Sequence, residues 1–302
     1  FIIYHFHWKR RGYPPGPMPL PIVGNFLQFD LANPHRTILR WRTIYGDVFT
    51  IWLPKPIVVL ASNEVLVEAL VKEREAFAAR PSSFLYRLFL GSHHEGDGII
   101  LSSGERYTST KKVRRGYLQG FGFGKNEMEV RIQFHIDRLL EQIDKLIDEN
   151  RTSMLDPHHP LAFCIGNIIH DIVIGKRYAF GDAEFNHFKH LIDKVLQQVQ
   201  SVQLLVADSY PWIAAFLPAF RSYYKNGMAL QNFFLDEIDE HEAEMNKSDH
   251  QDGDSRDFIE AYLKEMKKRV DNPHFNKLTL ALNAGDLWTG GMETTVTTIR
   301  WG

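Results

Sequence analysis

Apolar side chains recur every three to four residues through most of this chain, which is the spacing of amphipathic helices. The clearest case is residues 126–150, opened by the capping pair Asn126 and Glu129. Six apolar residues share one face of this segment: Ile132, Ile136, Leu139, Ile143, Leu146 and Ile147. The same spacing predicts further helices over 160–174, 182–206, 223–245, 257–270 and 279–302. The polar stretch 246–256 predicts a solvated loop between two of them.

A different pattern near the N-terminus predicts a β-hairpin. The strand-like runs 48–53 and 57–60 flank a Pro-Lys-Pro segment. Ser62 or Asn63 can then cap a short helix. Its predicted inner face consists of Val65, Leu66, Ala69 and Leu70. Because helix dominates the chain, we expect a mainly α fold with a small N-terminal β-sheet.

Composition narrows the class of protein. The chain has 302 residues, of which 44% are hydrophobic and 24% charged, the usual mixture of a globular protein. Its 35 basic and 37 acidic side chains give a net charge of -2, which argues against nucleic acid as a partner. Cys164 is the only cysteine, so these residues hold no internal disulfide and no paired-cysteine zinc site. Its apolar surroundings predict a buried neutral thiol.

The first 25 residues predict two segments outside the main fold. Residues 1–8 are apolar and aromatic but shorter than the roughly 20 residues that span a bilayer. Lys9, Arg10 and Arg11 follow, so residues 1–11 are interpreted as the remnant of an N-terminal membrane anchor, with a simple terminal tail as the alternative. Residues 12–25 contain five prolines and predict a stiff linker, the alternative being a proline-rich ligand.

Several motifs give only weak evidence for a functional site. The 14 histidines are scattered, so we interpret them as ordinary surface and core residues rather than metal ligands. The glycine-rich stretch 120–124 lacks the spacing of a phosphate loop, although a nucleotide site remains an alternative. A basic cluster is either a solvated face or an anion clamp: Lys111, Lys112, Arg114 and Arg115.

The last predicted helix contains the most informative motif. Gly290 and Gly291 each cost about 1 kcal/mol relative to alanine in a helix interior, so a helix built only for packing would avoid them. Their missing side chains would let a flat cofactor or substrate approach the backbone. Thr294 can hydrogen-bond to the preceding turn and open the helix locally. Glu293 and Thr294 together supply a carboxylate and a hydroxyl suited to proton transfer.

The stretch 286–301, read as DLWTGGMETTVTTIRW, resembles the distal haem helix of the cytochrome P450 family. It is most similar to the microsomal branch that metabolises drugs and steroids. Six other segments resemble this branch in the same order: 14–17, 45–49, 75–81, 103–107, 175–178 and 256–263.

The resemblance implies a haem-thiolate monooxygenase that acts on a small apolar substrate with dioxygen. It also implies an anchor in the endoplasmic reticulum membrane, exposure to the cytoplasmic face, and electrons from NADPH-cytochrome reductase. By position in the motif, Thr294 and Glu293 would form the proton relay, and Gly290 and Gly291 would line the dioxygen groove. Arg80 falls where this branch places a partner of a haem propionate.

Two further stretches correspond to positions that contact the cofactor or the substrate in the family. Tyr107 and Lys111 occupy positions where the family usually has a tryptophan and an arginine that contact the propionates. A phenol and an ammonium can still hydrogen-bond a propionate, but without the fork geometry of arginine. Ile100 and Leu101 match a loop that often touches substrate, the alternative being residues of a minor core.

The family's iron-ligating cysteine has no counterpart here, so we expect residues 26–302 to be the N-terminal part of the haem domain and to hold no metal ligand. The P450 fold would then be incomplete, and this chain alone would neither hold a thiolate-ligated haem nor turn over substrate. The alternative is a truncated, non-catalytic, membrane-tethered binding or regulatory protein.

Overall fold

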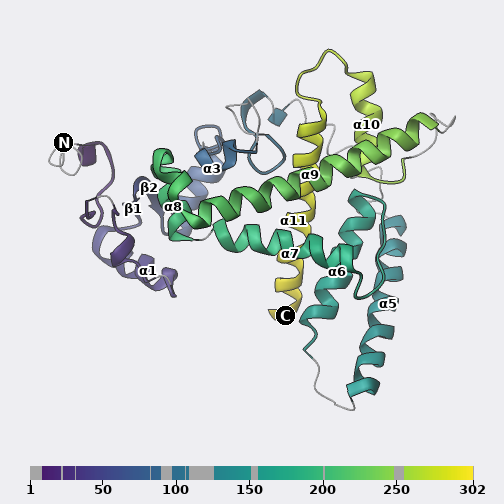
Figure 1. Cartoon of the computed structure of the whole chain (residues 1–302). Coiled ribbons are helices and arrows are strands. Elements are labelled where there is room, and N and C mark those ends of the chain that lie inside the picture. Colours follow the sequence, from purple (N-terminus) through teal and green to yellow (C-terminus); the bar gives the residue numbers. More distant parts are fainter. Residues whose placement is uncertain are drawn as a thin grey trace. The chain divides into compact units, whose positions relative to one another are not determined.

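The computed structural model describes residues 9–21, 23–30, 32–81, 83–89, 97–105, 107–108, 126–150, 156–199, 201–247 and 255–301 (Figure 1). The chain divides into two compact units. The first combines Phe1–Tyr86 with Leu196–Tyr224, and the second combines Arg87–Val195 with Lys225–Gly302. The mainly α fold with a small N-terminal sheet is confirmed.

The sheet of the first unit is the predicted hairpin. Strands β1 (Val48–Leu53) and β2 (Lys55–Leu60) pair antiparallel. The second strand begins two residues earlier than predicted and includes Pro56. Proline has no backbone N–H to donate, but the outer edge of a two-stranded sheet has no partner strand that needs one. Helix α1 (Pro34–Tyr45) packs its Trp41 against Phe49 of β1 to form the centre of this unit.

The proline-rich segment packs against β1. The backbone N–H of Thr50 donates to the carbonyl of Pro15, 2.9 Å away. A Cβ on Gly16 would lie 1.9 Å from the carbonyl oxygen of Thr50, so only glycine fits there. Asn25 is fully buried, and its Oδ1 accepts the N–H of Trp52 over 2.8 Å. These residues therefore belong to the packed part of the first unit.

The helix predicted after the hairpin is shorter than expected. Helix α2 (Asn63–Val67) is capped by Ser62 and passes into the π-helical turn η4 (Glu68–Lys72). Of its predicted inner face, Ala69 is buried, whereas Leu66 and Leu70 are exposed, so that part of the prediction is wrong. The π turn shifts Leu70 out of helical phase, but Leu66 precedes the turn, and its exposure has no such explanation. The other short elements are η2 (Lys9–Gly12), η3 (Phe26–Gln28), α3 (Phe84–Arg87) and η5 (Pro211–Phe216).

Long helices build the second unit, although residues 196–199 of α7 and 218–224 of α9 belong to the first. They include α5 (Asn126–Asn150), α6 (His158–Val173), α7 (Ala183–Val199), α9 (Pro218–Lys247), α10 (Phe258–Lys268) and α11 (Lys277–Trp301). The single helix predicted over 182–206 is wrong: α7 ends at Val199, and α8 (Val202–Ser209) follows. Ser201 caps α8 by accepting the N–H of Leu204, which starts a new helix within an unbroken apolar pattern.

The centre of the second unit lies where α6 packs against α11 (Figure 1). Trp288 of α11 is fully buried, and its ring meets that of Phe188 edge to face at 4.7 Å. Its Nε1 donates to Nδ1 of His170 on α6, 3.1 Å away. Burial lowers the pKa of His170 to about 3, so this histidine is neutral and can accept the bond.

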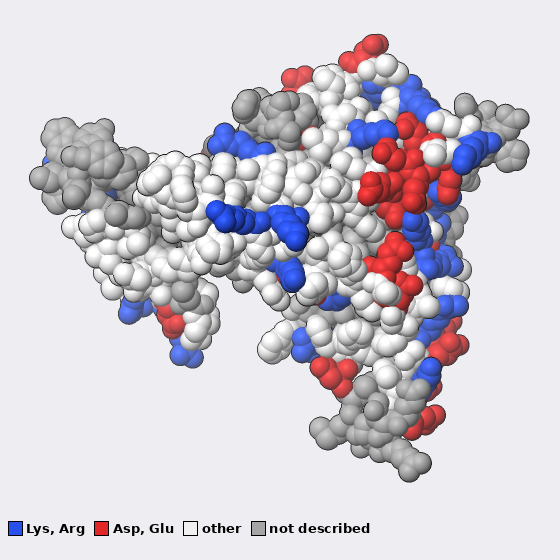
Figure 2. All heavy atoms as spheres, in the orientation of Figure 1, with Lys and Arg blue, Asp and Glu red and all other residues white. Residues whose placement is uncertain are grey.

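The C-terminal half of α9 joins three other segments through ion pairs, and Figure 2 shows acidic side chains gathered over it. Three cations each contact two carboxylates at 2.5–3.1 Å: Lys176 with Glu237 and Glu240, Lys277 with Asp239 and Glu242, and Arg256 with Glu244 and Asp257. We refer to this set as the α9 ion junction.

His241 lies inside the α9 ion junction and is only 2% exposed. Its Nδ1 is 2.7 Å from the carbonyl oxygen of Glu237. Its Nε2 is 3.1 Å from both the carbonyl oxygen of Ile174 and Oδ2 of Asp257. Burial opposes the charged form, but both nitrogens face acceptors, and the hydrogen bond to Asp257 outweighs burial and raises the pKa of His241.

None of the helices in the described ranges is both long and apolar enough to cross a bilayer. Residues 1–8 of the predicted anchor remnant, which covers 1–11, lie outside the described residues, as do the glycine-rich stretch 120–124 and the basic cluster that begins at Lys111.

Candidate functional site

Helix α11 has two opposite faces of different character. On the inner face, buried side chains recur every four residues from Ala284 through Trp288 and Met292 to Val296. On the outer face, offset by two residues, Gly290, Thr294 and Thr298 are exposed, as are Thr297 and Trp301. An offset of two residues turns a helical position by about 200°, so the packed face and the open face point in opposite directions.

The two adjacent glycines of α11, Gly290 and Gly291, serve different purposes. A Cβ on Gly291 would lie 2.7 Å from Cδ1 of Ile169, so this glycine permits the close approach of α6. A Cβ on Gly290 would meet nothing within 4 Å. Packing therefore accounts for Gly291, and only Gly290 leaves bare backbone facing open space.

Thr294 makes the predicted hydrogen bond to the preceding turn. Its Oγ1 donates to the carbonyl of Gly290 over 2.6 Å, and Thr298 repeats the pattern toward the carbonyl of Thr294 over 2.8 Å. The helix is nevertheless α-helical from Lys277 to Trp301, so the expected local opening is wrong. The hydroxyl shares the carbonyl with the helical N–H rather than displacing it. Glu293 is half-buried at the edge of the open face.

A loop is fastened to α11 by one carboxylate. Oδ2 of Asp286 accepts the backbone N–H groups of Ile99 at 2.7 Å and Ile100 at 2.9 Å. Gly98 has a φ of +77°, and a Cβ there would lie 2.5 Å from the same oxygen. The close approach of carboxylate and loop therefore requires glycine at this position.

A second carboxylate fixes the start of that loop. Asp97 is 2% exposed, and its Oδ2 accepts the hydroxyl of Thr279 over 2.7 Å. Its Oδ1 accepts the N–H of Gly98 over 2.8 Å. Sequence reasoning assigned no role to Asp286 or Asp97. An acidic residue within the apolar first half of α11 was a signal available in the sequence for the clamp that Asp286 forms on this loop.

The predicted site residues have separate locations. Ile100, 48% exposed, and the half-buried Leu101 lie on the loop that Asp286 fastens, so the structure brings them to α11. Arg80 belongs to the first unit and is exposed. Tyr107 is half-buried, and its N–H donates to the carbonyl of Ser103 over 3.4 Å. Lys111 lies outside the described residues.

The family model for cytochrome P450 matches residues 14–302, which is nearly the whole chain. The chain belongs to the cytochrome P450 family. The 3-ketosteroid oxygenase of Caenorhabditis elegans is 33% identical over 307 residues, covering 100% of this chain and 51% of that protein. Cytochrome P450 2B4 of Oryctolagus cuniculus is 33% identical over 306 residues, with coverage of 100% and 60%. Cytochrome P450 2J2 of Homo sapiens is 32% identical over 308 residues, with coverage of 100% and 59%.

This chain thus spans between about half and three fifths of the length of these P450 relatives. Membership of the family implies haem held by a cysteine thiolate as the cofactor of the complete protein. The open face of α11 fits a flat group, because Gly290 presents bare backbone and the next two exposed residues in its row, Thr294 and Thr298, carry short side chains.

Cys164 does not fit as the iron ligand of a P450. It is 5% exposed, and its Sγ donates to the carbonyl of His135 over 3.4 Å. Burial raises the pKa of its thiol to about 11, whereas a metal ligand must be a thiolate. Within the described ranges, no group of three or more His, Cys, Asp or Glu side chains is placed to hold a metal ion.

Proposed function

We propose that this chain forms the distal part of a haem-thiolate monooxygenase that inserts one oxygen atom of dioxygen into a small apolar compound. The observation that carries the proposal is the open face of α11, where Gly290 and Thr294 leave room for a flat cofactor. The bound haem would supply the iron at which dioxygen is activated. NADPH-cytochrome reductase is the proposed electron donor.

Thr294 and Glu293 are the proposed proton relay. The hydroxyl of Thr294 donates its own proton to the carbonyl of Gly290, which leaves its oxygen lone pairs directed away from the helix. It can therefore accept a hydrogen bond from a water molecule and fix that water at the open face. Glu293, half-buried one residue earlier, can replenish the proton from its carboxyl group.

Cofactor binding is assigned to residues from several segments. Gly290, with Gly291 beside it, is proposed to line the groove for dioxygen. Arg80, Tyr107 and Lys111 are proposed to bind the haem propionates. A guanidinium forms a bidentate, charge-assisted bond to a carboxylate, whereas a phenol and an ammonium contribute single bonds.

Substrate contact is assigned to Ile100 and Leu101. Their loop is held on α11 by Asp286, about one helical turn before the open face begins at Gly290. The substrate class is a xenobiotic, steroid or fatty acid. The name of the 3-ketosteroid oxygenase relative favours a steroid among these.

The proposed location is the endoplasmic reticulum membrane, with the fold on its cytoplasmic face and residues 1–11 as the remnant of the anchor. Similarity to cytochromes P450 2B4 and 2J2 supports this location. Residues 26–302 are the proposed N-terminal part of the haem domain, joined to the anchor through residues 12–25.

The test uses the complete protein with its reductase. Thr294→Ala should lower the amount of product formed per NADPH consumed, because a positioned proton-transfer group contributes about 10²–10⁴-fold to the step that it serves, and Thr294→Ser should restore most of it. Thr295→Ala, also exposed on α11, is the matched control and should leave the ratio unchanged. Equal ratios in the two alanine variants would refute the relay. A carbon monoxide difference spectrum without a thiolate-type band would refute the monooxygenase assignment.

A further inference from the structure

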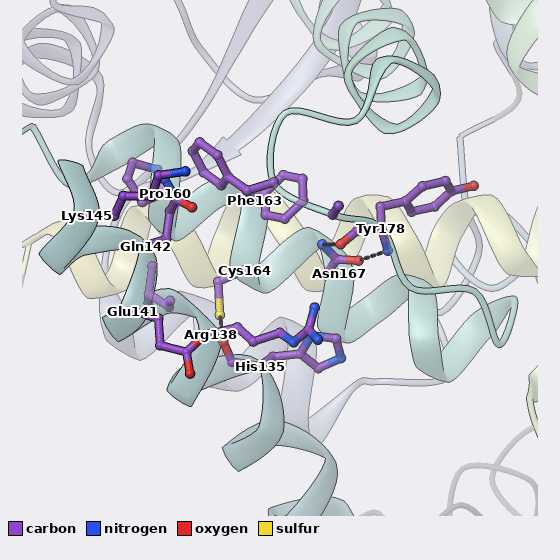
Figure 3. A pocket seen from close by; sticks show the side chains of 13 residues that line it. His135, Arg138, Glu141, Gln142, Lys145, Pro160, Phe163, Cys164, Asn167 and Tyr178 are labelled. Carbon is purple, nitrogen blue, oxygen red and sulfur yellow. Dashed lines mark hydrogen bonds between the residues drawn. The ribbon is translucent and has the colours of Figure 1, made fainter. Parts of the chain in front are cut away.

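A cavity of about 340 Å³ lies between α5, α6 and the segment 178–180 of the second unit (Figure 3). Its lining contains no residue of α11, and the proposed monooxygenase function does not use it. The volume falls within the range of small-molecule sites, about 300–1,000 Å³. Such sites combine apolar and aromatic walls with a few polar groups that fix the orientation of the ligand, and this cavity has both.

The walls of the cavity are mainly apolar and include two aromatic rings. The apolar lining residues are Leu139, Pro160, Phe163, Cys164, Ala179 and Phe180. The rings of Phe163 and Phe180 meet edge to face at 5.0 Å, and Phe163 meets Phe185 in the same way at 4.8 Å. Phe163 is thus held between two rings, whereas Phe180 keeps 36% of its surface exposed. This exposed part of Phe180 is available to a further aromatic ring.

Hydrogen bonds fix the segment 178–180 against α6. Nδ2 of Asn167 donates to the carbonyl of Tyr178 over 3.3 Å, and the N–H of Tyr178 donates back to Oδ1 of Asn167 over 2.8 Å. The hydroxyl of Tyr178 donates to a carboxylate oxygen of Glu184 over 3.0 Å. Because these groups are already held, the cavity is preformed and its occupant need not order it.

Charge does not select the occupant of this cavity. Its charged lining residues all lie on α5: the cations Arg138 and Lys145 and the carboxylate Glu141. Lys145 already has an interaction partner. The guanidinium of Arg138 lies 4.9 Å from the ring centroid of Phe134, a residue outside the lining. One cation and one carboxylate remain at exposed positions, so a charged ligand gains no net attraction for the hydration that it gives up.

The amide of Gln142 is a polar group of the cavity without a partner. Gln142 is half-buried, and in the part of the chain that the structure describes its amide makes no hydrogen bond. Figure 3 shows it near Pro160, with the ring of Phe163 beside them. A side-chain amide offers N–H donors and an acceptor oxygen next to each other. Another carboxamide matches both at once, because the two groups can join through two parallel hydrogen bonds.

We propose that this cavity binds a small neutral aromatic carboxamide. The aromatic ring of this ligand lies against Phe163 and Phe180, and its amide pairs with the amide of Gln142. A neutral ligand enters without losing the hydration of a charge. The proposal does not rest on the monooxygenase assignment, because no residue of α11 takes part in it.

Calorimetric titration of the full chain with 2-naphthamide tests the class of ligand. Because one hydrogen bond is worth up to about a factor of ten in affinity, 2-naphthamide should bind roughly tenfold more tightly than N,N-dimethyl-2-naphthamide, which has no N–H. Cyclohexanecarboxamide, without an aromatic ring, and the anion 2-naphthoate should also bind more weakly than 2-naphthamide. Affinity for either of these two equal to that for 2-naphthamide would overturn the proposal.

A variant of α5 tests the pairing of the amides. Gln142→Leu replaces the amide by an apolar group and should lower the affinity for 2-naphthamide about tenfold. Gln133→Leu is the matched control, because Gln133 is exposed on the same helix and does not line the cavity. Its affinity should equal that of the parent protein. Equal affinities of the two variants would overturn the assignment of Gln142.

A second pair of variants tests the aromatic wall. Phe180→Ala should lower the affinity for 2-naphthamide about tenfold, because the ligand loses one of its two ring contacts. Phe216→Ala removes an exposed ring from η5 of the first unit and should leave the affinity unchanged. Equal affinities of these two variants would contradict the placement of the ligand ring.

Filling the cavity gives a test of location. Cys164→Phe should bind one 2-naphthamide fewer per chain than Cys164→Ser, which keeps the volume open. Far-ultraviolet circular dichroism checks the folding of both, and equal stoichiometry in the folded variants overturns the proposal. Gln142→Leu and Phe180→Ala decide the same question if Cys164→Phe does not fold. Binding at the open face of α11 is common to all variants, so failure here leaves the monooxygenase assignment standing.

Discussion

Oδ2 of Asp286 accepts the backbone N–H of Ile100 over 2.9 Å, and this bond joins residues 186 positions apart in the chain. The same oxygen accepts the N–H of Ile99 at 2.7 Å. One carboxylate on α11 thus satisfies two consecutive backbone donors of a turn that lies outside helix and sheet. The position of a proposed substrate-contacting residue follows from this single side chain.

Removing that carboxylate should release the loop. Because hydrogen bonds to charged groups are worth about 1.5–3 kcal/mol, Asp286→Ala should lower the local opening free energy at Ile99 and Ile100 by about 2 kcal/mol. Asp286→Asn should lower it less, since its amide oxygen still accepts. Hydrogen exchange at the two amides measures the effect. Asp236→Asn, an exposed carboxylate on α9, is the control, and a loss of protection as large as that of Asp286→Ala in this variant would contradict the assignment.

Comparing alanine substitutions at two glycines with positive φ separates the cost of backbone strain from the cost of steric overlap. Gly98 has a φ of +77° and Gly104 one of +61°, but only at Gly98 would a Cβ collide, at 2.5 Å from Asp286. Alanine at either position should cost about 1–2 kcal/mol for the left-handed backbone. Gly98→Ala should cost a further 1–3 kcal/mol or so, because the carboxylate must move away from the loop. Urea unfolding of both variants checks this, and equal losses would show that the overlap is relieved without cost.

The glycine pair of α11 should respond asymmetrically to alanine. Gly290→Ala should raise the free energy of unfolding by about 1 kcal/mol, because the site is an open helix interior position. Gly291→Ala should raise the free energy of unfolding by less than this or should lower it, because the new methyl group meets Cδ1 of Ile169. Ile169→Val removes that carbon, so the double variant should recover the gain. A thermodynamic cycle of these variants by urea unfolding gives the coupling, and a value near zero would contradict the contact.

His241 should make stability depend on pH. Burial opposes its charge, but the hydrogen bond and charge of Asp257, with the carbonyl of Glu237, outweigh burial and the nearby Arg256 and raise the pKa of His241. A raised folded-state pKa stabilises the protein fully below the unfolded value of about 6.5, and this stabilisation is lost as pH rises through the folded value.

The test of this linkage compares His241→Gln with the parent protein in urea over that pH range. The difference in unfolding free energy should be largest on the acid side and shrink as the solution becomes alkaline. His187→Gln, exposed on α7, should show no such trend. A difference that stays constant with pH would mean that His241 is neutral in the folded protein.

Sequence reasoning succeeded where a signal was long and local. The amphipathic period of residues 126–150 predicted α5 with the observed bounds, and the GGMETT motif pointed to the helix that carries the open face. It failed where two helices share one apolar period: Ser201 starts α8, yet the pattern continues across it. Local signals also cannot separate Gly290 from Gly291, because the difference depends on Ile169 of another helix.

The clamp formed by Asp286 was outside the reach of sequence patterns for a related reason. Its partners are backbone N–H groups, which every residue except proline carries, so nothing in the loop sequence identifies them. Gly98 alone hints at a tight approach, and glycine is just as common in turns where nothing approaches the backbone. Similarly, the charge of His241 follows from the acceptors around it, which come from α9, from the end of α6 and from the residue before α10.

The α9 ion junction has a consequence for the tolerance of this protein to mutation. Each of its three cations contacts at least two carboxylates, and Arg256 also lies 3.6 Å from the carboxylate of Glu260. Loss of one carboxylate therefore leaves every cation with a counter-ion, whereas loss of one cation leaves two carboxylates facing each other. Natural variation here should be one-sided, with the carboxylates of α9 varying more than the three basic positions, whereas Asp257 should be retained because it also pairs with His241 and caps α10.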